Sequence, residues 1–297
     1  MPPSKTYSAK DITVLSGLEP VRVRPAMYIG DVSIAGLHHL VWEILDNCID
    51  EVMNGHASLI EVELDKDAGG IRLKDNGRGI PTDIHDEFGK SALELILTTL
   101  HAGGKFGDSN YQFSGGLHGV GASVVNALSE TLEVTVKRDG YKFFQSYSQG
   151  IPKAPVERVS ESRGHGTEIY FKPDPTIFPE TTFDPKIILE RLEAKSYLHR
   201  VNITFTDRSS NTVTKLDHGQ GIDGYLTRLV GTENRHPSYD QVFYTQKEQD
   251  PRLEMSLQWV DDEGEWVKSY VNGIPTIQGG THDSGLRAGV SRAMRNF

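Results

Sequence analysis

The sequence predicts an α+β protein with two domains. Three observations carry this prediction: an amphipathic helical pattern that begins after Gly36, a β-hairpin pattern between residues 60 and 73, and a length of 297 residues. A chain of that length has room for two hydrophobic cores. Further alternating and helical segments follow, so both strands and helices are expected along the chain.

Composition places the chain among soluble globular proteins. It is 37% hydrophobic and 24% charged, and no run of about 18 apolar residues could span a membrane. The first residues lack the apolar stretch of a secretory signal, and the single cysteine, Cys48, excludes an internal disulfide. We therefore expect a protein of the reducing cytoplasm, with no membrane partner.

The net charge of −10 argues against a general nucleic-acid-binding surface on this chain. Neutralising a phosphate backbone needs clustered lysine and arginine. If the protein acts on DNA, other chains or other segments should hold most of that DNA.

The predicted helix after Gly36 carries two stripes. Apolar residues recur at helical spacing and predict one buried face: Leu37, Leu40, Val41, Ile44, Leu45 and Cys48. Beside them runs a polar stripe of His39, Glu43, Asn47 and Asp50. Residues three or four positions apart share one face of a helix, so these polar side chains are expected to lie together.

The remaining elements are predicted from alternation and from helix signals. The hairpin has alternating residues at 60–64 and 71–73 around a turn at 67–70, and its second strand ends at Asp75. Helices are expected over 91–100, over 184–199 and from Leu286 to the end of the chain. Further strands are expected at 132–137, 141–147, 167–172, 254–260 and 265–272. A polar interval around 208–222 is the expected domain boundary.

The polar stripe has a chemical interpretation and an ordinary one. A carboxylate such as Glu43 can act as a general base on water, and a carboxamide such as Asn47 can hold a hydrated magnesium ion. His39 lies four residues before Glu43 and can pair with it. Acidic residues on an amphipathic helix more often form a solvated face. The choice between these interpretations depends on the motifs that follow.

Residues 75–81, Asp-Asn-Gly-Arg-Gly-Ile-Pro, form a candidate base-recognition loop. Asp75 at the end of a strand can accept a hydrogen bond from an exocyclic amine, and the glycines let the backbone lie against a flat base. An adenine satisfies that geometry, although Asp-Asn-Gly alone is an ordinary turn. Thr167, which begins a predicted strand, could share a water-mediated contact to the same base.

A glycine-rich segment at 115–121 leads into a helical stretch. Unobstructed backbone N–H groups and the positive end of a helix favour a polyphosphate, whereas the plainer interpretation is a surface loop. The pattern is not a P-loop, because Lys105 is followed by Phe106 rather than by Ser or Thr. Lys105 could still neutralise phosphate charge. No spacing of His or Cys indicates a zinc site.

In this order the motifs resemble those of the GHKL ATPases and, within them, the ATPase regions of the type II DNA topoisomerases, gyrase and topoisomerase IV. The resemblance covers nearly the whole chain and rests on residues 24–30, 43–51, 75–81, 100–106, 113–128 and 279–282. One departure is Ala26, which stands where the family usually has glycine.

The resemblance implies a Bergerat-type fold, in which a twisted mixed β-sheet carries helices on one face and the nucleotide lies between the two under a lid. It also implies the domain organisation. A dimerisation arm would occupy residues 1–20, a GHKL ATP-binding domain 21–215, and a truncated α/β transducer domain, similar to ribosomal S5 domain 2, residues 222–297.

Site roles follow from the same resemblance, with ATP and Mg²⁺ as the implied cofactors. Glu43 would be the catalytic base, His39 would assist it, Asn47 would bind the metal and Asp75 would recognise adenine. Tyr7 and Ile12 match an arm that reaches the partner's nucleotide in a dimer. The further ATP-binding residues that the resemblance implies are Asp50, Gly79, Ile80, Ile96, Gly104, Lys105, Tyr111, Gly115, Gly116, Leu117, His118, Gly119, Val120, Gly121 and Thr167.

The family's ATP-competitive inhibitors, aminocoumarins among them, use the same pocket. The resemblance assigns its lining to Ile44, Leu73, Asp75, Arg78, Gly79, Pro81, Ile96, Arg138, Thr167 and Ile169. Arg138 also has a plainer interpretation as a solvated residue beside the turn at Asp139 and Gly140, and both interpretations stay open.

The implied function is the ATPase part of a type II topoisomerase, in which ATP-driven self-dimerisation closes a gate for DNA strand passage. The first expectation is gyrase, a heterotetramer of two gyrase A and two gyrase B chains, with DNA held by the full complex and negative supercoiling as the outcome. The alternatives are the topoisomerase IV counterpart, which serves decatenation, and a GHKL nucleotide-gated clamp. The family's phosphate-sensing lysine, in a Gln-Thr-Lys loop, has no counterpart before Phe297, so weak hydrolysis by this chain is expected.

Overall fold

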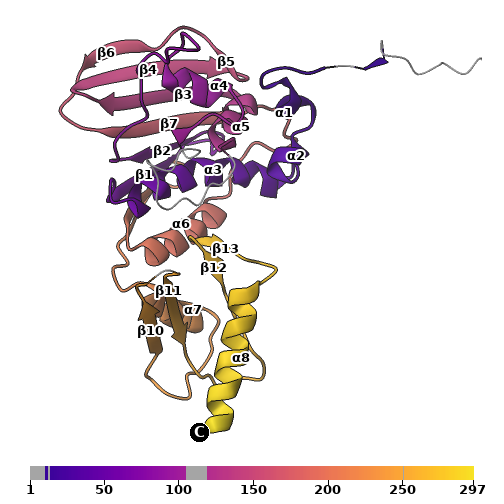
Figure 1. Cartoon of the computed structure of the whole chain (residues 1–297), viewed down its shortest axis with the longest axis vertical. Coiled ribbons are helices and arrows are strands. Elements are labelled where there is room, and N and C mark those ends of the chain that lie inside the picture. Colours follow the sequence, from indigo (N-terminus) through magenta and orange to yellow (C-terminus); the bar gives the residue numbers. More distant parts are fainter. Residues whose placement is uncertain (1–10, 13, 105–118, 250) are drawn as a thin grey trace, which may run out of the picture.

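The computed structural model describes residues 11–12, 14–104, 119–249 and 251–297. Within them lies a large sheet covered by helices, with a smaller region of short strands and two helices beyond it (Figure 1). No helix in these described ranges is both long and apolar enough to cross a membrane.

The large sheet contains nine strands among the described residues. These are β1 (Leu59–Leu64), β2 (Ile71–Asp75), β3 (Ser129–Arg138), β4 (Tyr141–Ser148), β5 (Ile151–Pro152), β6 (Glu157–Glu161), β7 (Gly166–Pro173), β8 (Asn202–Asp207) and β9 (Thr212–Leu216). Their order is β5-β4-β3-β7-β2-β1-β8-β9, with β6 beside β4. β1 pairs with β2 antiparallel and with β8 parallel, so the sheet is mixed.

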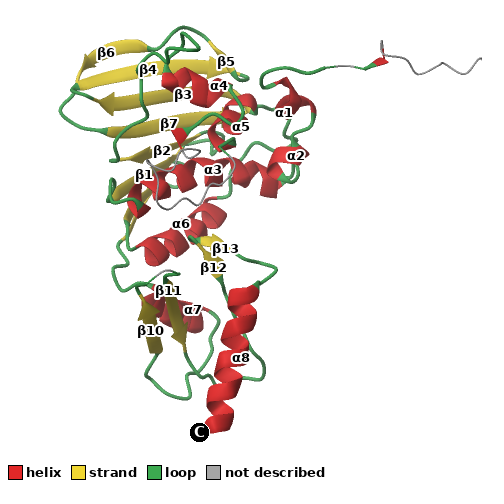
Figure 2. Ribbon diagram, in the orientation of Figure 1, coloured by secondary structure: helices red, strands yellow, loops and turns green. Residues whose placement is uncertain are grey.

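Helices cover one face of this sheet, as Figure 2 shows. They are α1 (Glu19–Val23), α2 (Ala26–Ile29), α3 (Ile34–Met53), α4 (Ala92–Thr98), α5 (Gly121–Ala127) and α6 (Pro185–His199). α3 contacts β2, α5 contacts β3, and α6 contacts β8 and β9. The predicted α+β class, with a mixed sheet and helices on one face, is confirmed.

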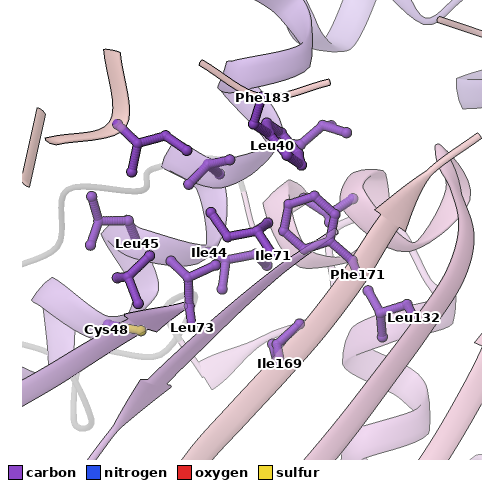
Figure 3. Packing of buried hydrophobic residues seen from close by; sticks show 14 of the residues in the cluster. Leu40, Ile44, Leu45, Cys48, Ile71, Leu73, Leu132, Ile169, Phe171 and Phe183 are labelled. Carbon is purple, nitrogen blue, oxygen red and sulfur yellow. The ribbon is translucent and has the colours of Figure 1, made fainter. Parts of the chain in front are cut away.

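The core lies between α3 and the sheet (Figure 3). Burial alternates along β1 and β2, so every second side chain faces the helices. Ile44 and Leu45 of α3 are almost completely buried, and so are Leu73 of β2 and Phe171 of β7. The ring of Phe171 meets the edge of Phe183 with centroids 6.0 Å apart, a favoured aromatic arrangement.

The smaller region follows β9. It contains α7 (Ile222–Thr232), β10 (Phe243–Lys247), β11 (Leu253–Leu257), β12 (Tyr270–Val271), β13 (Ile274–Pro275) and α8 (Thr281–Asn296). β10 pairs with β11, and β12 pairs with β13 through a turn at Asn272 and Gly273. Both turn residues have positive φ, as a two-residue hairpin turn requires.

The amphipathic helix α3 begins earlier than its hydrophobic pattern predicts. α3 starts at Ile34 rather than after Gly36, because Ser33 caps it by accepting a hydrogen bond from the Ala35 amide at 3.2 Å. Gly36 therefore lies inside the helix. A Cβ at this position would lie 1.9 Å from the Asp31 carbonyl oxygen, so the close approach of the preceding turn requires glycine.

Other boundaries also differ from the predicted ones. The strand expected at 265–272 is limited to Tyr270–Val271, because only these two residues pair with β13. The strand expected at 254–260 is β11, and it stops at Leu257. The interval at 208–222 contains β9, which lies beside β8. The last helix begins at Thr281 rather than Leu286, and α1 begins at Glu19, within the stretch predicted as an arm.

Replacing Phe171 by alanine should lower the free energy of unfolding by about 3 to 5 kcal/mol, since the ring is fully buried and the cavity cannot collapse completely. Urea denaturation measures the change. The matched control is Lys172→Ala on the same strand, whose side chain is 41% exposed and ion-paired only at 3.8 Å. A loss for Phe171→Ala no larger than for this control would contradict the core assignment.

Candidate functional site

The polar stripe of α3 forms the first part of the site. His39 Nε2 lies 3.0 Å from Glu43 Oε1, with the two side chains 40% and 32% exposed. Asn47, one turn further on, is half-buried. Asp50 is completely buried, so it turns toward the interior while Glu43 keeps access to solvent. The pairing of His39 with Glu43 that the spacing predicts is present.

Glu43 also lies against the beginning of α5. A Cβ added to Gly121, the first residue of α5, would come within 1.9 Å of Glu43 Oε2. Only glycine leaves room for the carboxylate there. Two of the predicted motifs, the polar stripe and the end of the glycine-rich segment, therefore meet at one carboxylate.

Asp75 forms the second part of the site. Its Oδ1 accepts hydrogen bonds from the Gly77 amide at 2.7 Å and from the Thr167 amide at 3.4 Å. Burial raises the pKa of the Asp75 carboxyl to about 6, while those amides and the Cys48 thiol act in the opposite direction. The carboxylate is an acceptor inside a nearly dry environment, which suits recognition of a neutral N–H donor.

The contact between Asp75 and Thr167 depends on a close approach of two backbones. Gly166 has φ +128°, and a Cβ on it would lie 2.1 Å from the Asp75 carbonyl oxygen. A side chain at Gly166 would separate β7 from the end of β2. The Gly-His-Gly-Thr segment therefore brings the Thr167 amide to Asp75, and the expected water-mediated contact of Thr167 to a base stays a prediction.

The loop after Asp75 is held from several sides. The Ile80 amide donates to Thr167 Oγ1 at 3.2 Å, and Arg138 donates to the Gly79 carbonyl oxygen at 2.8 Å. Gly79 has φ +78°, and a Cβ there would lie 2.8 Å from the Lys137 carbonyl oxygen. Arg138 also bonds Asp139 at 3.1 Å. Arg138 thus bonds both the loop and the turn residue Asp139, and its role as a pocket residue stays a prediction.

Three residues that sequence reasoning did not single out also hold this loop. Glu51 accepts a hydrogen bond from the backbone amide of Arg78 at 2.9 Å. It also accepts two from the Arg78 guanidinium, at 2.7 and 3.1 Å. His165 Nδ1 donates to the Gly77 carbonyl oxygen at 2.6 Å. The buried thiol of Cys48 lies beside Asp75 and lowers the pKa of its carboxyl. Glu51 lies four residues after Asn47, so extending the helical spacing by one step would have found it.

The apolar residues predicted to line an inhibitor pocket divide into two groups. Ile44, Leu73 and Ile169 are buried together in the core between α3, β2 and β7 (Figure 3). Ile96 on α4 is half-buried and Pro81 is exposed. Their role as pocket walls stays a prediction.

Part of the predicted site lies outside the described residues. This applies to Tyr7, Lys105, Tyr111, Gly115, Gly116, Leu117 and His118. On the two sides of that gap, Gly104 follows α4, and Gly119 and Val120 precede α5. The lid and the arm therefore remain predictions from the sequence.

Two family models match the chain. The model described as "Histidine kinase-, DNA gyrase B-, and HSP90-like ATPase" matches residues 33–177, and the one described as "DNA gyrase B" matches residues 221–297. The first range contains α3, Asp75 and Thr167. The second contains the smaller region that follows β9.

Individual proteins agree with these matches. The DNA gyrase B protein of Thermotoga maritima is 45% identical over 98% of this chain and 47% of its own length. The Synechocystis gyrase B is 46% identical over 98% of this chain and 27% of its own length. The chain thus spans about half, or less, of such relatives. The crystal structure of the 43K ATPase domain of Thermus thermophilus gyrase B, in complex with an aminocoumarin, superimposes with a TM-score of 0.81, at 37% identity over 94% of this chain and 72% of that one.

Replacing Asp75 by asparagine should stabilise the ligand-free chain near neutral pH. Because the folded-state pKa is raised to about 6 from an ordinary value of 3.8, the folded state holds this proton more tightly, and stability falls as pH rises between those values. The loss amounts to at most about 3 kcal/mol. Asparagine cannot ionise but keeps an oxygen for the Gly77 and Thr167 amides.

Urea denaturation at pH 4 and pH 7.5 tests this expectation. The difference between Asp75→Asn and the parent chain should be larger at pH 7.5. Asp240→Asn, at an exposed position, is the matched control and should show no such pH-dependent difference. A parent chain that is equally or more stable than Asp75→Asn at pH 7.5 would argue against a strained buried carboxylate.

Proposed function

Because the chain belongs to the DNA gyrase B family, we propose that it binds ATP between α3 and the residues 75–81 loop and hydrolyses it. The observation that carries this proposal is Glu43, which is partly exposed, paired with His39 at 3.0 Å and in contact with the start of α5. A carboxylate so placed can activate a water molecule beside a bound phosphate chain.

Adenine recognition is assigned to Asp75. Its carboxylate would accept a hydrogen bond from the exocyclic amine, with Thr167, Gly79 and Ile80 beside it. The fit is supported by the chemistry of the site, because a buried acceptor with its own amide donors stays in one position. The Gly79 and Gly166 backbones lie so close to neighbouring backbone that neither position has space for a side chain.

Hydrolysis is assigned to the polar stripe of α3. Glu43 accepts a proton from a water molecule as the water oxygen bonds to the γ-phosphorus, and the bond from that phosphorus to the bridging oxygen breaks to release ADP. His39 holds the Glu43 carboxylate in position. Phosphoryl transfer depends mainly on such positioning and on charge neutralisation.

Magnesium and the phosphate contacts complete the proposal. Mg²⁺, when bound, neutralises phosphate charge, and it is commonly held by one or two protein oxygens together with phosphate oxygens and water. Asn47, one turn from Glu43, supplies a carboxamide oxygen of this kind. Lys105, the 115–121 segment, Gly104 and Tyr111 are proposed for the phosphates. Asp50 is proposed only to support the site, because it is completely buried.

The activity of the complete enzyme is also proposed, on the basis of its relatives. In this proposal ATP binding joins two copies through an arm that includes Tyr7. The closed dimer then acts with two gyrase A chains in strand passage and negative supercoiling of DNA in the cytoplasm. The net charge of −10 supports leaving most DNA contacts to other parts of that complex.

Aminocoumarin-type inhibitors are proposed to bind the same site. The Thermus thermophilus gyrase B domain was crystallised in complex with an aminocoumarin. In the present chain, Arg138 bonds the Gly79 carbonyl oxygen and Arg78 bonds Glu51. The Arg78 guanidinium belongs to the 75–81 loop and that of Arg138 lies beside it. Both groups could there contact a ligand that replaces adenine.

Replacing Glu43 by alanine should lower kcat for ATP hydrolysis by about 100- to 10,000-fold, because the general base is removed. The dissociation constant for ATP should change little, since adenine and phosphate contacts remain. Coupled-enzyme kinetics and calorimetry measure the two quantities. Glu190→Ala, at an exposed position of α6, should leave both unchanged. Parent-like turnover in Glu43→Ala would remove Glu43 from the mechanism.

Replacing Asp75 by asparagine should weaken ATP binding by about tenfold to a hundredfold, the usual value of a hydrogen bond to a charged acceptor. Because burial raises the pKa of Asp75 to about 6, affinity of the parent chain should also fall as pH decreases below that value. The variant should lack this pH dependence. Calorimetric titrations at pH 5.5 and pH 7.5 measure the ATP affinity of the parent chain and of Asp75→Asn. Equal affinities for the two proteins would exclude the adenine role.

A further inference from the structure

A buried lysine on α6 forms an ion pair with α3 and donates a hydrogen bond to the smaller region. Lys195 Nζ lies 2.6 Å from Asp46 Oδ1 on α3 and donates to the Gly273 carbonyl oxygen at 3.0 Å. The Lys195 side chain is 2% exposed and that of Asp46 is 20% exposed. One ammonium group therefore joins three elements that are far apart in the sequence.

Asp46 places this contact beside the residues proposed for ATP hydrolysis. Asp46 immediately precedes Asn47 and lies three residues after Glu43, on the same helix that carries the polar stripe. Burying an ammonium group is costly unless it is paired and hydrogen-bonded. Since Lys195 is held by both partners, displacing the β12–β13 hairpin would remove one of them and strain the other.

A second contact fits the same hairpin closely against α6. His199 lies one turn after Lys195, and a Cβ on Gly273 would come within 2.0 Å of His199 Nε2. Gly273 also has φ +73°, so both space and backbone conformation require glycine. Burial lowers the pKa of His199 to about 4, so the ring is neutral near pH 7 and adds no second cation beside Lys195.

A third contact between the end of α6 and the smaller region is exposed to solvent rather than buried. Arg200, which follows α6, lies 3.7 Å from Glu254 on β11, with side chains 46% and 33% exposed. Exposed ion pairs contribute little, and this one does not touch α3. It therefore offers an internal comparison for the buried contact.

We propose that Lys195 is a positioning residue that couples the β12–β13 hairpin to α3 through Gly273 and Asp46, and thereby keeps Glu43 and Asn47 placed for ATP hydrolysis. The proposal rests on the function proposed above for α3. Movement of the smaller region then changes the rate of the chemical step through α6.

The test removes both charges together, in Asp46→Leu/Lys195→Met, because removing one partner would leave the other buried and unpaired. Spin labels at Ser160→Cys on β6 and Ser291→Cys on α8, both exposed positions, report the distance between the two regions by double electron–electron resonance. The only natural cysteine, Cys48, is buried. Kinetics on the same full chain without labels give kcat and KM for ATP.

The parent chain should give a narrow distance distribution. The double variant should give a broader one, with kcat lowered about threefold to thirtyfold and KM within about twofold, since the adenine contacts remain. Glu254→Gln, the exposed comparison, should behave like the parent. If the double variant does not fold, Asp46→Asn/Lys195→Gln, which removes both charges but keeps polar groups at both positions, should change both quantities in the same direction by less.

Three results would overturn the proposal: a parent-like distance distribution in the variant that folds, a parent-like kcat in that variant, or an equal broadening in Glu254→Gln. Failure of the proposed function is a separate outcome. It would appear as normal turnover in Glu43→Ala, whereas the distance distributions still report whether Lys195 joins the hairpin to α3.

Discussion

The packing of α3 against the sheet is the constraint on which the rest of the structure depends. One side of the helix is buried against β2 and its neighbours, and the adjacent stripe carries Glu43 and Asn47 at partial exposure. A rotation of the helix by one residue, about 100°, would carry the polar stripe into the core or the apolar stripe into solvent. Close packing therefore fixes the direction of the catalytic side chains to within a small angle.

The loop after Asp75 shows a different way of holding a site. It has no regular structure, and its backbone is fixed by side chains from elsewhere: Glu51 from α3, Arg138 from β3, and His165 and Thr167 at the start of β7. Each contact gives a backbone N–H or C=O group of the loop a hydrogen-bond partner. Rigid elements on three sides thus position a loop whose own sequence could adopt many conformations.

The elements predicted best are those whose pattern is local. α3, the β1–β2 hairpin and α6 follow from periodicity and caps, and the His39–Glu43 pair follows from a four-residue spacing. The contact between Asp75 and Thr167 depends on β2 lying beside β7, which are about ninety residues apart, and no local pattern fixes that pairing. Here the family resemblance, not periodicity, brought the two residues together. Short strands such as β5 and β13 escaped prediction because two residues carry no alternation.

The parallel pairing of β1 with β8 bears on how the chain folds during synthesis. β1 is complete at Leu64, whereas its parallel neighbour begins only at Asn202. Until α6 and β8 leave the ribosome, one edge of β1 has unpaired N–H and C=O groups, and such edges recruit other strands. Loop closure over this separation is also slow. The nascent chain therefore presents an open edge while more than a hundred further residues are translated.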